Sequence, residues 1–275
     1  MSSPSEKVKK LVEELKSRTK TESYVLQLKP GVPPGLLDSK FGGLPYWEPS
    51  QPYPQDGRGN KLFLLAQINF DQFHVKQPLP QGGMLQFFIR NDDVYGLDFD
   101  RPDVQDTFRV VYHPEIDYSV TREQVLALDI PTHEDAESSP VFQETAVALE
   151  PSAAYLHCGD VRFDRLFSQL VQEVLGEELG DQNVYRYLGS DDFAYLDEQC
   201  STNGHRLLGY PYFTQCDPRP ADSPYDTLLF QMDSDIVDHE DVVLWGDCGV
   251  ANFFINGDDL KRLDFSRVLY NWDCC

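Results

Sequence analysis

The segment Asp241-Val-Val-Leu-Trp-Gly-Asp-Cys-Gly-Val-Ala-Asn-Phe-Phe-Ile255 decides the fold, because its second part occurs twice in the chain. Gly249-Val-Ala-Asn-Phe-Phe-Ile255 matches Gly83-Met-Leu-Gln-Phe-Phe-Ile89, and the copies lie 166 positions apart (255 minus 89). Each copy is a short apolar run that follows a glycine turn, a pattern typical of a buried β-strand. The repeat predicts two related halves, at about 21–140 and 141–275.

The segments that precede these two strands repeat as well. Each half has a Gly-x-Pro-aromatic turn, a proline-rich loop and a Leu-Leu-x-Gln strand. The repeated residues are Gly43, Pro45 and Gln67 in the first half and Gly209, Pro211 and Gln231 in the second. We interpret them as structural, because glycine permits backbone angles that other residues resist and a buried amide must find hydrogen-bond partners in the nearby turn.

These patterns predict an α+β fold that is internally duplicated, with mainly antiparallel sheets in a pseudo-twofold globule and a few peripheral helices. We expect an N-terminal amphipathic helix in residues 1–20, capped by Ser3 with Glu6, and a single domain in residues 21–275. A second helix is expected to begin at Asp160 as its cap and to end at Gly176. Residues 185–200 show no clear period.

Composition excludes several classes of function. The formal net charge is −23, which repels nucleic-acid phosphates and favours a basic protein or peptide as the partner. No apolar run reaches the ~20 residues of a membrane-spanning helix, and no secretory signal is apparent at the N-terminus. We therefore expect a cytoplasmic protein without membrane association and with reduced cysteines. The sequence makes no prediction of oligomeric state.

Several motifs occur in an order that resembles the YwqG-like family of bacterial proteins. They are Phe41-Gly-Gly-Leu-Pro45, Leu64-Leu-Ala-Gln-Ile68, Leu79-Pro-Gln-Gly-Gly-Met-Leu-Gln-Phe-Phe88, His205-Arg-Leu-Leu-Gly-Tyr-Pro211, Leu228-Leu-Phe-Gln231 and Trp245-Gly-Asp-Cys-Gly249. The resemblance extends from about residue 42 to residue 273. It implies an internally duplicated α+β fold with no established activity, and it assigns no catalytic residues.

Two sets of residues are candidate binding sites. The aromatic turns carry Tyr46, Trp47, Tyr212 and Phe213, and a separate turn carries Trp245, Asp247 and Cys248. The first half has no equivalent of Asp247 and Cys248, so the repeat does not explain them, although an Asp in a tight turn is commonly structural. We predict a non-enzymatic binding protein. The alternative is a hydrolase that uses Asp247 with Cys248 or His205.

No cofactor or metal site is predicted, because the chain lacks a phosphate loop, a dinucleotide motif and the spacing of metal-binding cysteines and histidines. His157 and Cys158 are adjacent, and neighbouring residues of a strand point to opposite faces. They could act together as base and nucleophile only where the chain turns between them. The adjacent Cys274 and Cys275 have no predicted role.

Overall fold

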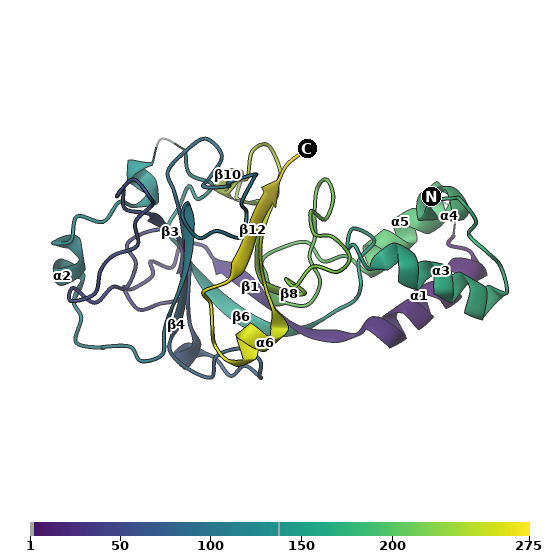
Figure 1. Cartoon of the computed structure of the whole chain (residues 1–275), viewed down its shortest axis with the longest axis horizontal. Coiled ribbons are helices and arrows are strands. Elements are labelled where there is room, and N and C mark those ends of the chain that lie inside the picture. The colour runs from purple at the N-terminus through teal and green to yellow at the C-terminus, as the bar shows by residue number, and fades with distance from the viewer. Residues whose placement is uncertain (1–2, 137) are drawn as a thin grey trace.

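The computed structural model describes residues 3–136 and 138–275, which form a large curved sheet and a smaller helical lobe beside it (Figure 1). The helices are α1 (Glu6–Thr19), α2 (Arg122–Leu126), α3 (Phe163–Leu175), α4 (Val184–Leu188), α5 (Ser190–Gln199) and α6 (Gly257–Lys261). The strands are β1 (Thr21–Lys29), β2 (Lys40–Phe41), β3 (Phe63–Asn69), β4 (Met84–Ile89), β5 (Phe108–His113), β6 (Thr145–Ala154), β7 (Arg206–Leu208), β8 (Thr227–Asp233), β9 (Asp235–Val237), β10 (Glu240–Val243), β11 (Val250–Ile255) and β12 (Val268–Asp273).

Ten strands form one antiparallel sheet in the order β12-β11-β8-β7-β1-β6-β2-β3-β4-β5. The central pair, β1 and β6, runs in register from Thr21 opposite Ala154 to Lys29 opposite Ala146. We call β2–β5 the first wing of the sheet and β7, β8, β11 and β12 the second wing. Strands β9 and β10 form a separate two-stranded ribbon. The α+β class and the mainly antiparallel sheet are thus confirmed.

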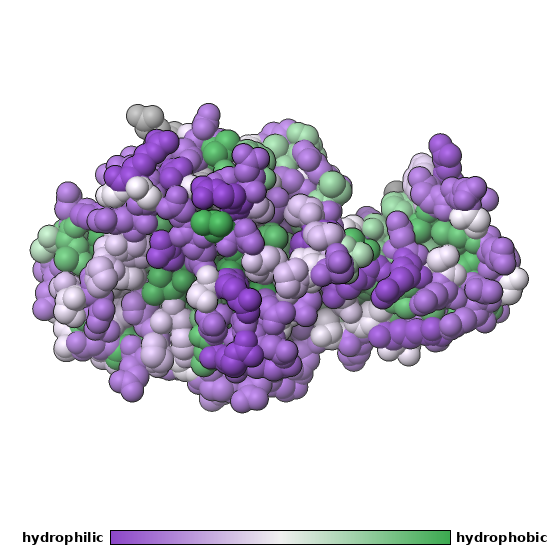
Figure 2. All heavy atoms as spheres, viewed as in Figure 1, coloured by the Kyte–Doolittle hydropathy of each residue, from purple (hydrophilic) through white to green (hydrophobic). Residues whose placement is uncertain are grey.

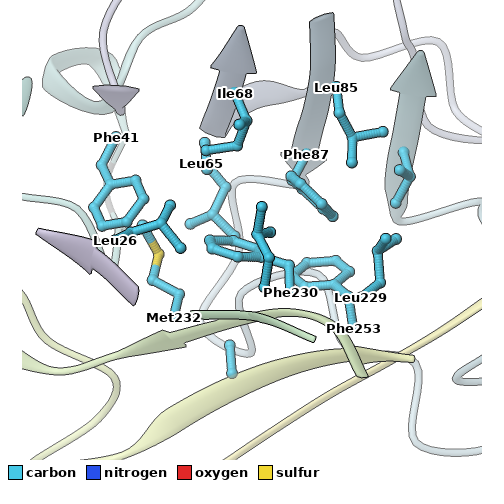
Figure 3. Packing of buried hydrophobic residues seen from close by; sticks show 14 of the residues in the cluster. Leu26, Phe41, Leu65, Ile68, Leu85, Phe87, Leu229, Phe230, Met232 and Phe253 are labelled. Carbon is cyan, nitrogen blue, oxygen red and sulfur yellow. The ribbon is translucent and has the colours of Figure 1, made fainter. Parts of the chain in front are cut away.

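The sheet is bent so strongly that its two wings pack against each other in a nearly barrel-like arrangement. In the core between them (Figure 3), the Phe87 ring of β4 lies 4.6 Å from that of Phe230 and 5.0 Å from that of Phe253. Near the outer edges, Gln105 bridges the wings, since its Oε1 accepts from the Val110 N–H and its Nε2 donates to the Phe265 carbonyl, both at 2.7 Å. The curvature buries the apolar runs found in the sequence.

Two fully buried glutamines hold the aromatic turns of the two wings. Gln67 Oε1 accepts from the Tyr46 N–H at 3.0 Å, and Gln231 Oε1 accepts from the Tyr212 N–H at 2.8 Å. Each amide nitrogen also donates to two carbonyls, those of Leu36 and Asp38 for Gln67 and those of Thr202 and Gly204 for Gln231. Both amides therefore have partners on the neighbouring turn backbone, as a buried amide requires.

The repeated glycines begin these same turns. Gly43 and Gly209 have φ angles of 72° and 84°, which lie in the left-handed region that favours glycine. A Cβ on Gly43 would lie 2.1 Å from Glu144, and one on Gly209 would lie 2.8 Å from Ala154. The prolines at 45 and 211 follow two residues later in each turn.

The helical lobe packs α1 against α3 and α5, which lie far from it in the sequence (Figure 1). The predicted stripe of α1 is buried there, at Val8, Leu11, Val12 and Leu15. The predicted cap was wrong by two residues: the Ser5 side chain, not Ser3, accepts from the Val8 N–H. Among the described helices, none is long and apolar enough to cross a membrane.

One further expectation for the lobe is corrected. Asp160 does not cap α3, which begins at Phe163. Its carboxylate instead forms ion pairs with Arg162 and with the buried Arg219. The helix does end at Gly176, which is left-handed with a φ of 70°. The segment without a clear period forms two short helices, α4 and α5, and α5 has a single fully buried residue, Leu196.

Candidate functional site

A groove of about 580 Å³ lies between the edge strand β5 and the proline-rich loop after the first aromatic turn. Among the described strands, β5 has one hydrogen-bonded neighbour, β4. The groove is lined by side chains from both segments, including Trp47, Glu48, Tyr53, Arg109, His113 and Glu115. It combines an aromatic wall with charged groups, which together are features of a binding site. The edge strand beside it has one main-chain donor already in use, because the Val110 N–H donates to Gln105 Oε1.

Hydrogen bonds on both sides of Tyr46 fix the wall of the groove. Gln67 accepts from its N–H, and Gln86 Nε2 donates to its carbonyl at 2.8 Å. The Tyr46 hydroxyl accepts from the Asp117 N–H at 2.9 Å and lies 3.2 Å from Glu48 Oε1. Tyr46 is itself fully buried, so it positions the groove rather than lining it.

Trp47 forms the floor of the groove at the next position. Its indole N–H donates to the Gln51 carbonyl at 3.1 Å, which closes the start of the proline-rich loop. Its ring meets those of Tyr53, Phe88 and His113 edge-on, with centroids 5.0, 5.9 and 5.1 Å away. Such T-shaped contacts add rigidity to an aromatic cluster, so the groove is largely preformed.

The charged groups of the groove have unequal environments. Glu115 is exposed at the rim and Glu48 is half-buried. Arg109 projects from β5, and its Nε is buried without a hydrogen-bond partner among the described residues. Burial lowers the pKa of His113, whose Nε2 lies 3.0 Å from Gln86 Oε1. The groove therefore presents carboxylates at its rim and one unsatisfied donor deeper inside.

The second aromatic turn lies elsewhere. The Phe213 ring stacks on Phe254 at 6.2 Å in a small cluster of the second wing. Tyr212 is partly exposed, and its ring centroid lies 5.8 Å from that of His157. In the described part of the chain, no ring contact joins this turn to Trp47. The structure thus places the two turns in separate surroundings.

Trp245, the aromatic residue of the other candidate turn, is fully buried. Its ring lies 5.4 Å from that of Tyr95 and 6.1 Å from that of Trp272. It forms part of the core beneath the turn. Asp247 and Cys248 are exposed on the surface above it.

His205, the base of the hydrolase alternative, interacts with other residues of the second wing and of the β9–β10 ribbon. Its Nδ1 accepts from the Asp233 N–H at 3.1 Å, and its Nε2 lies 3.5 Å from an Asp235 carboxylate oxygen. Its ring packs on Phe41 at 4.8 Å. Within the described residues, no hydrogen bond or ion pair links it to Asp247 or Cys248, so the three do not form a catalytic group here.

A cluster that the sequence did not reveal joins His157 and Cys158 to Asp197 of α5. The chain turns after β6, so both side chains reach the same carboxylate, at 3.0 Å from His157 Nε2 and 3.2 Å from Cys158 Sγ. The three ligand atoms lie within 4.8 Å of one another, as a metal site requires. However, His157 Nδ1 accepts from the Gly159 N–H at 3.1 Å, which leaves the proton on Nε2, where a metal would bind.

The thiol of this cluster is not activated. Burial, together with the hydrogen bond to Asp197, raises the pKa of Cys158 to about 12. Its thiol therefore stays protonated at neutral pH and is a poor nucleophile. The arrangement ties the end of β6 to the helical lobe, and Asp197 accepts from both groups. No sequence signal identified Asp197, because it lies 39 residues from Cys158.

A family model described as a domain of unknown function (DUF1963) matches residues 39–274. The match includes both wings of the sheet and the helices between them, and α1 and β1 precede it. No curated protein matches the chain.

Proposed function

The chain belongs to the DUF1963 family, whose description names no activity, and we propose that it is a non-enzymatic binding protein that takes an extended, basic peptide segment into the groove on β5. The observation that carries this proposal is the position of an aromatic, carboxylate-rimmed groove beside the edge strand β5. The partner is either a free peptide or an extended segment of a basic protein.

The strand edge supplies affinity without sequence specificity. An extended peptide can add to an edge strand through main-chain hydrogen bonds, and alternate side chains then enter pockets beside it. On β5 the peptide would take the place of the Gln105 side chain at the Val110 N–H. Side chains at 109, 111 and 113 of β5 face the groove, since all three positions line it. The unpartnered Arg109 Nε fits a role as donor to a carbonyl of the added peptide.

The side chains of the groove supply specificity. Tyr53 offers a half-buried aromatic ring that is backed by Trp47, itself 3% exposed, and aromatic residues often dominate binding energy in protein interfaces. Glu48 and Glu115 at the rim favour Lys or Arg on the ligand. The net charge of −23 adds long-range attraction for a basic partner. Figure 2 shows hydrophilic side chains over most of the face in view.

The same proposal includes a common origin for the two wings by internal duplication. It is supported by the matching hydrogen bonds of Gln67 and Gln231 and by a bulged residue two positions before each glutamine, Leu65 in β3 and Leu229 in β8. We also propose that the chain belongs to the YwqG-like bacterial group, on the basis of its motifs. A cytoplasmic location is proposed on the basis of its composition.

Selection from a phage-displayed library of random linear peptides tests the binding function on the full chain. We expect recovered peptides to be enriched in Lys and Arg next to an apolar residue. Synthetic copies should lose about fivefold or more in affinity when Glu115→Lys reverses a rim charge, since ~1 kcal/mol corresponds to that factor. Fluorescence anisotropy at two salt concentrations measures the loss.

The matched control is Glu178→Lys, which makes the same change in net charge at an exposed position after α3. Equal loss of affinity in both variants would show that only net charge matters and would refute the groove. Failure to enrich any basic peptide would refute the proposal as a whole. Arg109→Met provides a second check, because it removes the unpartnered donor without altering the aromatic wall.

A further inference from the structure

Two exposed thiols lie side by side at the end of the second wing. Cys248 Sγ, in the turn before β11, is 3.2 Å from Cys275 Sγ, just after β12. All six cysteines fall within the described residues, and all are free thiols. The groove on β5 uses neither member of this pair, and the first wing has no cysteine at the corresponding turn.

The end of the ladder between β11 and β12 brings the two thiols together. The last pair of the ladder is Val250 with Asp273, and Cys248 lies in the turn just before it while Cys275 lies two residues beyond it. The two sulfur atoms are 3.2 Å apart, and a disulfide bond is roughly 2.05 Å long, so the sulfurs need to approach by roughly 1 Å to form one.

The neighbouring thiol is directed differently. Cys274 packs against the backbone of Gly246, where an added Cβ would lie 2.8 Å from its sulfur. Burial raises the pKa of the Cys274 thiol, and the hydrogen bond with Cys248 raises the pKa of the Cys275 thiol, so the pKa values do not separate the two and the position of the sulfur atoms does. Cys275 meets Cys248 sulfur to sulfur, whereas Cys274 lies against Gly246 and Asp247 of the same turn.

We propose that Cys248 and Cys275 form a reversible disulfide when a low-molecular-weight disulfide oxidises them. One protein thiolate attacks the reagent, forming a mixed disulfide and releasing one small thiol. The second protein thiolate then attacks the protein sulfur of that mixed disulfide and releases the other small thiol. The protein loses two electrons and two protons, and the reagent becomes two thiols, so the exchange balances and is reversed by excess thiol.

The bond would fasten the turn at 246–249 to the end of β12. Asp273, the last residue of β12, accepts from the backbone N–H groups of Thr214 and Gln215, which follow the second aromatic turn. The disulfide would therefore restrain the surroundings of that turn as well. This role is independent of peptide binding on β5.

The test equilibrates the full chain with mixtures of oxidised and reduced glutathione, quenches with acid, alkylates free thiols and maps the peptides by mass spectrometry without reduction. We expect a 248–275 cross-link at an oxidised-to-reduced ratio at least about tenfold lower than that needed for mixed disulfides on the exposed Cys216, because the second step is intramolecular. Cys248→Ser and Cys275→Ser should each abolish the cross-link, whereas Cys274→Ser should leave it unchanged.

Two results would overturn the proposal. One is a cross-link between Cys274 and either Cys248 or Cys275 in place of the 248–275 bond. The other is modification of Cys248 and Cys275 as separate mixed disulfides, at the same ratio as Cys216. Circular dichroism checks that each serine variant is folded. Cys248 and Cys275 are both exposed, so loss of the cross-link in a folded variant of either residue reflects the missing thiol.

Discussion

The two wings of the sheet share an internal framework but differ at their outer ends. In each, a buried glutamine of the inner strand holds an aromatic turn through the same three kinds of hydrogen bond. The outer strand of the first wing, β5, borders an open groove, whereas the outer strand of the second, β12, ends beside a pair of thiols. Residues that repeat build the framework, and residues that do not repeat carry the candidate chemistry.

A second difference concerns buried cations at matching positions. Lys40 is fully buried, and its Nζ lies 2.7 Å from Glu144 Oε1. Arg206, 166 positions later, donates to the Asn203 carbonyl at 2.6 Å, and its Nε has no partner among the described residues. Burial lowers the pKa of Arg206 to about 10. The first wing thus neutralises its cation with a carboxylate in direct contact, while the second solvates its cation with a carbonyl.

The largest expected effect comes from replacing the glutamines. Gln67→Leu and Gln231→Leu each leave a turn N–H and two carbonyls without partners, and each unsatisfied buried group costs about 1–3 kcal/mol. We expect each variant to lose about 4 kcal/mol of unfolding free energy in guanidinium titrations. If only one of the two variants lost stability, the two glutamines would not have equivalent roles in their wings. Gln81→Leu, at an exposed position, is the control.

A smaller effect separates the two cations. Glu144→Gln leaves the Lys40 ammonium buried without its counter-charge, and because Glu144 is partly exposed we expect a loss of about 2 kcal/mol at neutral pH. Burial lowers the pKa of folded Lys40 below its usual 10.5, so the folded chain releases this proton before the unfolded chain does. The loss should therefore shrink as the pH rises toward 10.5.

Adding Lys40→Met to Glu144→Gln removes the buried charge and should restore most of that stability. Urea unfolding of the single and double variants, analysed as a double-mutant cycle, gives the coupling between the two residues. If Glu144→Gln alone costs no more than Asp233→Asn beside Arg206, then the proposed difference between the wings is wrong.

The smallest effect is a pH dependence in the first wing. His133 Nδ1 accepts from the Gly43 N–H at 3.1 Å, and burial lowers the His133 pKa below its usual 6.5. The unfolded chain then binds this proton more tightly, so stability is full above pH 6.5 and falls as the pH drops below it. The slope contributed by one histidine is at most about 1.4 kcal/mol per pH unit.

Guanidinium unfolding between pH 5 and 8 measures that slope, and His133→Asn should reduce it. The exposed His74→Asn is the matched control. An unchanged slope in the His133 variant would show that Gly43 does not depend on a neutral imidazole.

The strands that carry the repeated motifs could be predicted from the sequence because each is marked by a run of neighbouring apolar residues. The apolar runs of β3 and β4 are buried throughout, as uninterrupted runs of this length indicate. The prediction that the Gln67 and Gln231 amides form hydrogen bonds with the turn backbone is confirmed. Helices α4 and α5 escaped notice because they are short and present little continuous apolar face.

The candidate sites depended on information that no local pattern contains. Arg109 and His113 border a groove only because β5 ends the sheet, and strand order is a property of the whole fold. Cys248 meets Cys275 only because β11 pairs with β12. Asp197 reaches Cys158 because the lobe packs beside the end of β6. Each is a long-range consequence of packing.

The helical lobe also has a consequence for synthesis of the chain. The apolar stripe of α1 is covered by α3 and α5, and α3 starts at residue 163. A ribosome that adds roughly 5–20 residues per second needs about 7–30 s to advance from residue 19 to residue 163. During that interval the nascent α1 carries an uncovered hydrophobic face, which is the kind of surface that chaperones recognise. Helix α1 therefore completes its packing only after α3 and α5 have been made.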